Sequence, residues 1–236
     1  MAYYSNIISL GFFCSVASEL ERVGLRSASY PFDWLISDFE GVVKAIESHF
    51  EDFLNYDNMA QYEMNPSFYK DQKYKMQFYH DFDECNSLKK QLPKVKEKYG
   101  RRIERFYSSI KNPTLFLRYI ESQDEVEWIE RNLDRINSLF CSFNDKNSII
   151  WIANSEIKSK HLPIFSVEKD DNDSVARTFL ESNKELKQML ESIDFSNRES
   201  NLVFFNRKQN KTKKKNYKNI LIRKIRKPYS HTVKYS

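Results

Sequence analysis

The feature that most limits the fold is a nearly continuous apolar run at residues 148–153, Ser-Ile-Ile-Trp-Ile-Ala. The run is too short for an ordinary helix, and its β-branched and aromatic side chains favour a strand. A strand without alternating polar positions is typical of a parallel sheet with both faces covered. We therefore expect this strand to be buried on both sides.

The rest of the chain alternates between strand-like and helix-like segments. Strands are predicted at residues 6–10, 114–118, 148–153, 162–167 and 202–205, and helices at residues 14–23, 35–53, 88–111, 125–139 and 175–192. The alternation favours an α/β layered fold with a central, mainly parallel sheet flanked by helices. We expect the long helix at residues 88–111 to be interrupted at Pro93 or Gly100.

Residues 54–83 have no clear period. They are rich in Tyr, Asn and Asp and contain Pro66, so they predict a long irregular segment with short strands only near residues 75–79. Irregular segments of this length within a compact domain are usually functional.

The net charge of +5 conceals two regions of opposite character. From residue 200 onward there are 12 Lys or Arg and no Asp or Glu, whereas the preceding body has 26 basic against 33 acidic residues. We predict a single α/β domain at residues 1–205 and a basic, flexible tail at residues 206–236. Such a tail suits contact with an acidic partner or a membrane surface.

Three widely spaced cysteines, Cys14, Cys85 and Cys141, offer no CxxC pair. They are best explained as reduced thiols in a cytoplasmic environment. No signal peptide and no apolar run of about 20 residues is present, so no transmembrane segment is expected. Glycine-rich phosphate loops and metal-binding motifs are also absent, and we expect neither a cofactor nor a metal.

Cys14 is the first candidate for chemistry. It follows the strand at residues 6–10 and Gly11, and it opens the predicted helix at residues 14–23. A helix N-terminus favours the thiolate, and the N–H groups of residues near Gly11 to Ser15 could hold an oxyanion. Cysteine is also among the most buried residue types and packs as a small apolar residue, so its position alone does not establish catalysis.

His80 is the best candidate for a general base among four histidines, because it lies between aromatic residues and close to Asp81 and Asp83. A carboxylate can orient an imidazole and stabilise its cationic form. A solvated histidine in an acidic turn would have the same local sequence.

A second set of polar residues is predicted at the sheet edge. Asp33 lies between Phe32 and Trp34, where a carboxylate must be paired or have a raised pKa. Arg118 ends one strand and Asn154 follows another, so both share the carboxyl edge with Cys14 if the sheet is parallel. Arg118 could pair with Asp33 or bind an anion, and Asp33 could instead cap the next helix.

The opening of the chain resembles a known family in its pattern Ile8-Ser9-Leu10-Gly11, Cys14, Ala17, Leu20, Gly24-Leu25-Arg26, Ser29 and Pro31-Phe32-Asp33-Trp34. This is a bacterial family of uncharacterised domains described as "putative papain-like cysteine peptidases". Weaker similarities are His80-Asp81, the helix at residues 101–106 and the strand ending at Arg118, so the resemblance covers about residues 5–155. It implies Cys14 as nucleophile, His80 as base and Asp81 or Asp83 as orienting acid. It also implies the alternative fold, a papain-like α+β arrangement.

Three functions remain open from the sequence. The first is a papain-like cysteine peptidase or related thiol hydrolase that acts on a peptide or amide bond. The second is a sugar- or nucleotide-binding or glycan-assembly domain without thiol chemistry, which would use Asp33, Arg118 and Asn154. The third is an interaction protein that docks through its basic tail. The substrate is accordingly a peptide, a glycan or another small molecule.

Overall fold

The computed structural model describes residues 3–63, 65–168 and 178–193. The chain divides into two units, residues 1–196 and 197–236, and the second unit lies outside the described residues. The predicted strand at residues 202–205 and the predicted tail at residues 206–236 therefore also lie outside them. The domain boundary at residue 205 stays a prediction.

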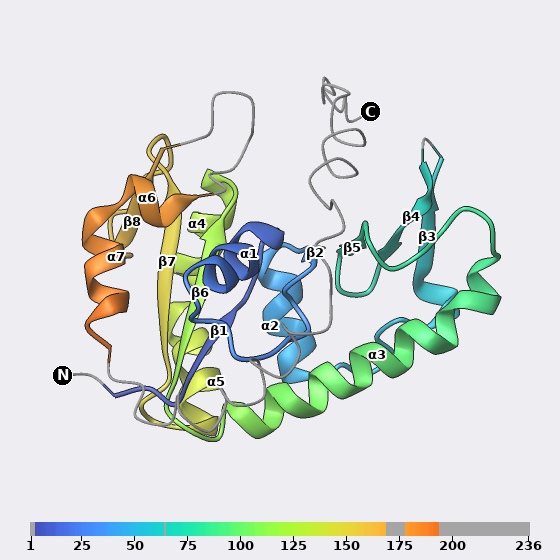
Figure 1. Cartoon of the computed structure of the whole chain (residues 1–236), viewed down its shortest axis with the longest axis horizontal. Coiled ribbons are helices and arrows are strands. Elements are labelled where there is room, and N and C mark those ends of the chain that lie inside the picture. Colours follow the sequence, from blue (N-terminus) through green and yellow to red (C-terminus); the bar gives the residue numbers. More distant parts are fainter. Residues whose placement is uncertain (1–2, 64, 169–177, 194–236) are drawn as a thin grey trace, which may run out of the picture. The chain divides into compact units, whose positions relative to one another are not determined.

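A parallel sheet of four strands lies at the centre of the described chain (Figure 1). In spatial order its strands are β1 (Asn6–Ser9), β6 (Thr114–Ile120), β7 (Ser148–Asn154) and β8 (Ile164–Val167). All three neighbouring pairs are parallel, so the carboxyl ends of all four strands meet at one edge. The predicted α/β layered fold with a parallel sheet is confirmed.

Helices cover both faces of this sheet (Figure 1). The helices that pack with one face are α1 (Cys14–Arg22), α6 (Phe179–Ser182) and α7 (Lys184–Glu191). Those that pack with the other face are α2 (Phe39–Glu47), α3 (Leu88–Ser109), α4 (Gln123–Arg131) and α5 (Leu133–Phe143). The predicted helix at residues 125–139 is thus two helices that meet at Asn132.

Strand β6 supplies both layers, because successive side chains of a strand point to opposite faces. Leu117 and Tyr119 lie in the apolar layer that contains α1, whereas Phe116 and Ile120 lie in the layer that contains α2 to α5. Arg118 has the same parity as Phe116 and Ile120, and it therefore points to the face opposite α1.

Residues 54–83 form three strands of a second, antiparallel sheet, and the prediction of a largely irregular segment is wrong. The spatial order is β2 (Leu35–Ile36), β5 (Met76–Phe78), β4 (Asn65–Asp71) and β3 (Met59–Tyr62), with a 3-10 turn η1 (Tyr56–Asn58) before β3. The strands are short and the β3–β4 register shifts between Gln61 and Tyr62, which disrupts a regular two-residue period. The predicted helix at residues 35–53 also begins later, because its first residues form β2.

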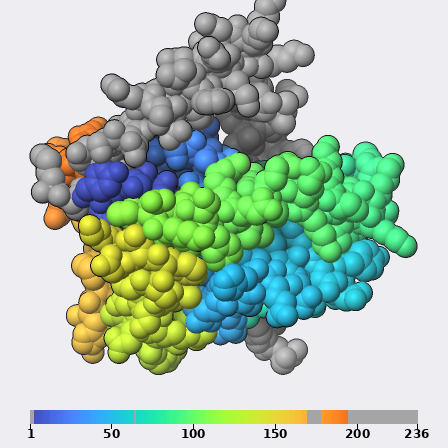
Figure 2. All heavy atoms as spheres, turned by 90° about the horizontal axis from the view of Figure 1, so that it is seen from below, coloured from blue at the N-terminus to red at the C-terminus, as the bar shows by residue number. Residues whose placement is uncertain are grey.

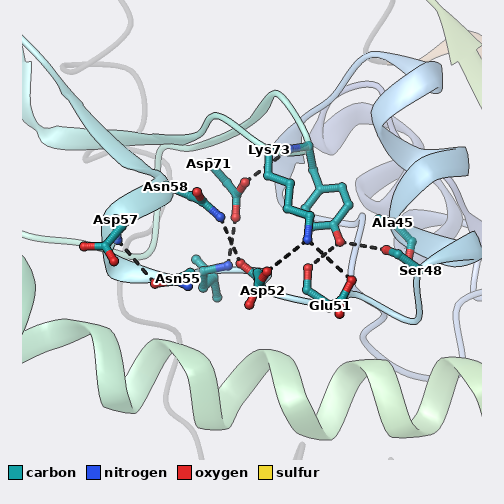
Figure 3. Close-up of polar contacts among 11 residues, drawn as sticks. Ala45, Ser48, Glu51, Asp52, Asn55, Asp57, Asn58, Asp71 and Lys73 are labelled. Carbon is teal, nitrogen blue, oxygen red and sulfur yellow. Dashed lines mark hydrogen bonds and ion pairs between the residues drawn. The ribbon is translucent and has the colours of Figure 1, made fainter.

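The segment after α2 reverses direction through residues with positive φ. His49, Phe50, Asp52 and Leu54 have φ of 53–58°, which ends the helix well before residue 53. The buried carboxylate of Asp71 on β4 fixes this segment by accepting the backbone N–H of Leu54 at 2.8 Å, and burial raises its pKa. Figure 3 shows these contacts together with the ion pairs that join Lys73 to the same segment.

Helix α3 joins the two sheets. It runs without interruption through Pro93 and Gly100, and Figure 2 shows it (green) lying along residues 50–70 (light blue). The ring of Tyr99 packs edge-on against Phe78 of the antiparallel sheet at 5.6 Å between centroids. About two turns further along, Phe106 packs against Phe116 of the parallel sheet at 6.2 Å between centroids. The two sheets consequently share one apolar core.

Candidate active site

The site is built from the turn between β1 and α1. The pairing with β6 continues past the end of β1, since Leu10 N–H donates to the Leu117 carbonyl at 2.8 Å and Tyr119 N–H donates to the Gly11 carbonyl at 2.9 Å. Gly11 has a φ of +81°, which glycine adopts without steric cost. A Cβ at this position would lie 2.9 Å from Ser37 Oγ and 3.2 Å from Arg118 Nη1. The turn therefore needs glycine both for its conformation and for space.

Cys14 is the first residue of α1, at the carboxyl edge of the parallel sheet. The preceding residue, Phe13, has no side-chain acceptor, and the first turn contains no acidic residue. The side chain of the N-cap residue therefore does not use the N–H groups of the first turn, and the positive end of the helix dipole favours an anion there. The thiol itself lies in a half-buried residue, whereas Cys85 and Cys141 are exposed.

Ser15 lies beside Cys14 and is almost completely buried, with 3% of its surface exposed. Its hydroxyl has no hydrogen-bond partner among the described residues. A buried hydroxyl without a partner is unusual, because desolvation of a polar group is unfavourable. The first turn of α1 thus combines a thiol, a hydroxyl and backbone donors that are not used by a side-chain cap.

Arg118 supports this turn from the opposite face of the sheet. Its Nη1 donates to the carbonyl of Leu10 at 2.9 Å and to Ser37 Oγ at 3.1 Å, and its Nη2 donates to the Ser37 carbonyl at 2.6 Å. Nε donates to Glu125 Oε1 at 2.8 Å, and Nη2 lies 2.6 Å from the same oxygen. These contacts use the donors of a fully buried guanidinium, so Arg118 fixes the protein framework around Gly11.

Asp33 is held by a different arginine. Arg26 Nη2 lies 2.7 Å from Asp33 Oδ2, which also accepts the backbone N–H of Tyr30 at 2.8 Å. Burial raises the pKa of the Asp33 carboxyl, and the charge of Arg26 opposes that rise. The same guanidinium lies 5.3 Å from the ring centroid of Trp34. Asp33 and Arg118 therefore belong to separate ion pairs and do not pair with each other.

His80 lies just after β5 and is exposed. The neighbouring Asp81 is turned toward α3, where its carboxylate accepts from Lys98 Nζ and, at 3.0 Å, from the Tyr99 hydroxyl. Asp83 organises the next turn by accepting the N–H groups of residues 85 and 86, each at 2.9 Å. The Asn86 side chain and these N–H groups lower the pKa of Asp83.

The remaining candidate, Asn154, ends β7 and is 4% exposed. Its Oδ1 accepts the N–H of Glu156 at 3.0 Å, as in a local turn. β7 lies two strands from β1 in the sheet, so Asn154 shares the carboxyl edge with Cys14 but follows a strand that is not a neighbour of β1.

The short strand β2 brings most of the other candidates together. Ser37 N–H, directly after β2, donates to the carbonyl of Phe12 at 2.9 Å, two residues before Cys14. On its other side, β2 pairs with β5, so that Leu35 lies beside Phe78, two residues before His80. The Cys14 turn, the Asp33–Trp34 segment and the His80 segment are therefore successive neighbours.

The sequence did not identify the residues that hold the candidates in place. In the sequence, Glu125 is only the first residue of a predicted helix, although its spacing from Arg118 is compatible with an ion pair between a strand and the following helix. Arg26 lies seven residues before Asp33 in the opening pattern, and their opposite charges were the available signal for their pairing. Lys98 and Tyr99 carried no local signal, because their partner Asp81 is distant in sequence.

Comparison with known proteins identifies the family of the chain. The model of a family described as "Putative papain-like cysteine peptidase" matches residues 5–147, and the chain belongs to this family. The matched residues include Cys14, Asp33, His80 and Arg118, whereas Asn154 lies beyond the match.

A viral protein is also similar. Uncharacterized protein R408 of Acanthamoeba polyphaga mimivirus is 30% identical to the chain over 176 residues, which is 64% of this chain and 79% of R408. No solved structure matches the chain at a significant level. In the described ranges, no helix is both long enough and apolar enough to cross a membrane.

Proposed function

We propose that this protein is a papain-like thiol hydrolase that cleaves a peptide or amide bond with Cys14 as its nucleophile. The observation that carries the proposal is the position of Cys14 at the start of α1, where no side chain caps the helix. Such a position stabilises a thiolate and supplies N–H donors to a developing oxyanion.

The proposed reaction has two stages. His80 accepts the proton of the Cys14 thiol, and the thiolate attacks the carbonyl carbon of the substrate. The oxyanion accepts hydrogen bonds from backbone N–H groups of the first turn of α1. Collapse of this intermediate expels the amine, which takes the proton from His80, and water then hydrolyses the thioester.

The alternative of a sugar or nucleotide site at Asp33, Arg118 and Asn154 has less support. Asp33 and Arg118 are buried in ion pairs, and Asn154 accepts a hydrogen bond within a local turn. Their polar groups are therefore already used within the protein.

The cellular setting forms part of the proposal. No disulfide joins the three cysteines, which suits a reducing compartment such as the cytoplasm. The basic sequence from residue 206 onward would contact an acidic partner or membrane surface. The substrate would be a peptide or another molecule with an amide bond.

The nucleophile can be tested by alkylation with iodoacetamide at neutral pH, with each cysteine followed by mass spectrometry. Cys85 and Cys141 are internal controls, because both are more exposed than Cys14. Faster alkylation of Cys14 would show activation that exposure does not explain. Alkylation of Cys14 no faster than that of the two controls would contradict the proposal.

The base can be tested in the same assay and by digestion of a peptide library. His80→Gln should slow Cys14 alkylation and reduce any turnover by about 100-fold or more, because general-base catalysis has this size. His161→Gln, which changes another exposed histidine, is the matched control. Cleavage that survives Cys14→Ala would exclude Cys14 as the nucleophile.

A further inference from the structure

A second group of charges lies where α3 meets the segment that carries Asp33. Arg105 Nη1 donates to the carbonyl of Ser29 at 2.5 Å. One turn earlier, the guanidinium carbon of Arg102 lies 5.1 Å from the ring centroid of Tyr99. One turn before that, Lys98 pairs with Asp81. This spacing places the three cations on one side of the helix.

The ion pairs of this group leave two cations, Arg102 and Arg105, without a carboxylate partner among the described residues. Arg26 pairs with Asp33, and Lys98 pairs with Asp81. Arg102 interacts electrostatically with Asp33, but it forms no ion pair within 4.0 Å in the described parts of the chain. The group thus has a surplus of positive charge at Arg102 and Arg105.

Arg102 also has an unused donor. Its Nη1 is buried and has no hydrogen-bond partner among the residues that the structure describes. A guanidinium remains charged in proteins, and a buried donor without a partner is unfavourable because its lost hydration is not replaced. The residue as a whole is half-buried, so part of its side chain is accessible from outside.

We propose that Arg102, together with Lys98 and Arg105, binds an oxyanion group of a ligand beside the Asp33–Trp34 segment. The planar guanidinium suits a carboxylate or a phosphate, which can accept two of its N–H groups at once. Asp81 links this site to the segment that carries His80, because the carboxylate of Asp81 binds Lys98 and Tyr99. The bound group would hold the ligand close to that segment. The proposal does not depend on the chemistry of Cys14.

The test measures anion binding by the full chain, with inorganic phosphate and succinate as separate probes. Ionic strength is kept constant with sodium chloride, and binding is followed by calorimetry and by the ligand-dependent rise in melting temperature. Saturable binding is expected for the wild type. Tighter binding of phosphate would identify a phosphorylated ligand, and tighter binding of succinate would identify a carboxylate ligand.

Three variants assign the binding to Arg102. Arg102→Gln should weaken it by about 10-fold or more, and Arg102→Lys should weaken it less, because the charge remains but the planar fork is lost. Arg101→Gln is the matched control, since Arg101 is exposed and pairs with Glu97 on the adjacent side of α3. Its binding should equal that of the wild type.

A purely structural role of Arg102 gives a different result. In that case Arg102→Gln lowers the melting temperature without ligand, but phosphate and succinate raise it as much as in the wild type. That result would overturn the proposal, as would an absence of saturable binding in the wild type. If Arg102→Gln does not fold, Arg102→Lys decides the question, because wild-type affinity in that variant would contradict recognition by the guanidinium fork.

Discussion

Arg118 on β6 and Glu125 on α4 form an enclosed ion pair, with side-chain exposures of 0% and 7%. The other side of the guanidinium binds the Leu10 carbonyl, directly before the turn that leads to Cys14. Burial raises the pKa of the Glu125 carboxyl, whereas the charge of Arg118 opposes this effect. One pair of charges thus joins α4, β6 and the end of β1.

Removal of the Glu125 charge should therefore destabilise the protein. Glu125→Gln leaves the guanidinium of Arg118 buried without its carboxylate, for which a loss of about 3–5 kcal/mol is expected. Urea unfolding can measure the change, with Glu127→Gln as a control because Glu127 is exposed on the same helix. Similar small losses in the two variants would show that the pair contributes little.

The turn at Gly11 should tolerate alanine less well than the turn at Gly24. Both glycines have positive φ, at +81° and +73°, so either substitution should cost about 1–2 kcal/mol in conformational strain. Only at Gly11 would the new Cβ also crowd Ser37 and Arg118, whereas no atom lies within 4 Å at Gly24. We expect Gly11→Ala to lose at least twice as much unfolding free energy, and equal losses would argue against the crowding.

The Arg26–Asp33 pair should produce a pH-dependent effect. Arg26→Gln leaves a buried carboxylate without its cation and should cost about 3 kcal/mol or more at neutral pH. The pKa of Asp33 is already raised in the folded protein and should rise further in the variant. As the pH falls through this raised pKa, the folded form takes up the proton before the unfolded form does, and the folded form is stabilised.

The loss of unfolding free energy caused by Arg26→Gln should therefore become smaller when the pH is lowered from about 7 to about 5. Unfolding in urea at both pH values measures it, and Arg131→Gln, which changes an exposed arginine, provides the control. A loss of unfolding free energy that increases at the lower pH would contradict this prediction, because protonation of Asp33 should stabilise the folded variant.

Two helical glycines should respond to alanine in opposite directions. At Gly41 on α2 a Cβ would lie 2.0 Å from the carbonyl oxygen of Tyr74, so Gly41→Ala should separate α2 from the segment between β4 and β5. At Gly100 on α3 no atom lies within 4 Å, and Gly100→Ala should stabilise the helix by about 0.5–1 kcal/mol. Thermal unfolding of both variants tests this contrast. A Gly41→Ala protein with the melting temperature of the wild type would contradict it.

The parallel sheet was predictable because its strands contain short apolar runs and because helical periods lie between β1 and β6 and between β6 and β7. The start of α1 at Cys14 was predictable for the same reason, since Gly11 interrupts the strand and a helical period follows. Both are local signals. Asn132, where α4 gives way to α5, gave no such signal, because the apolar positions continue in phase across it.

The antiparallel sheet and the ion pairs depend on contacts between distant residues. Strand β2 has two residues and is defined only by its pairing with β5, so no periodicity could reveal it. The positions of Glu125 and Arg26 follow from the sequence, but their ion pairs do not, because an ion pair depends on how strands and helices are arranged. The positions of the candidate residues were thus predictable, but the contacts that fix them were not.

The two residues of β2 connect the segment of the proposed thiol with the segment of the proposed base. Cys14 begins a helix that packs on the parallel sheet, and His80 follows the antiparallel sheet, so neither sheet alone determines their separation. One added residue within β2 would turn the residues that follow it to the other face of the strand and shift β5 relative to the Cys14 turn. The length of β2 would then control the separation of Cys14 and His80. Related chains with a longer or shorter β2 would accept substrates of a different size while keeping both sheets.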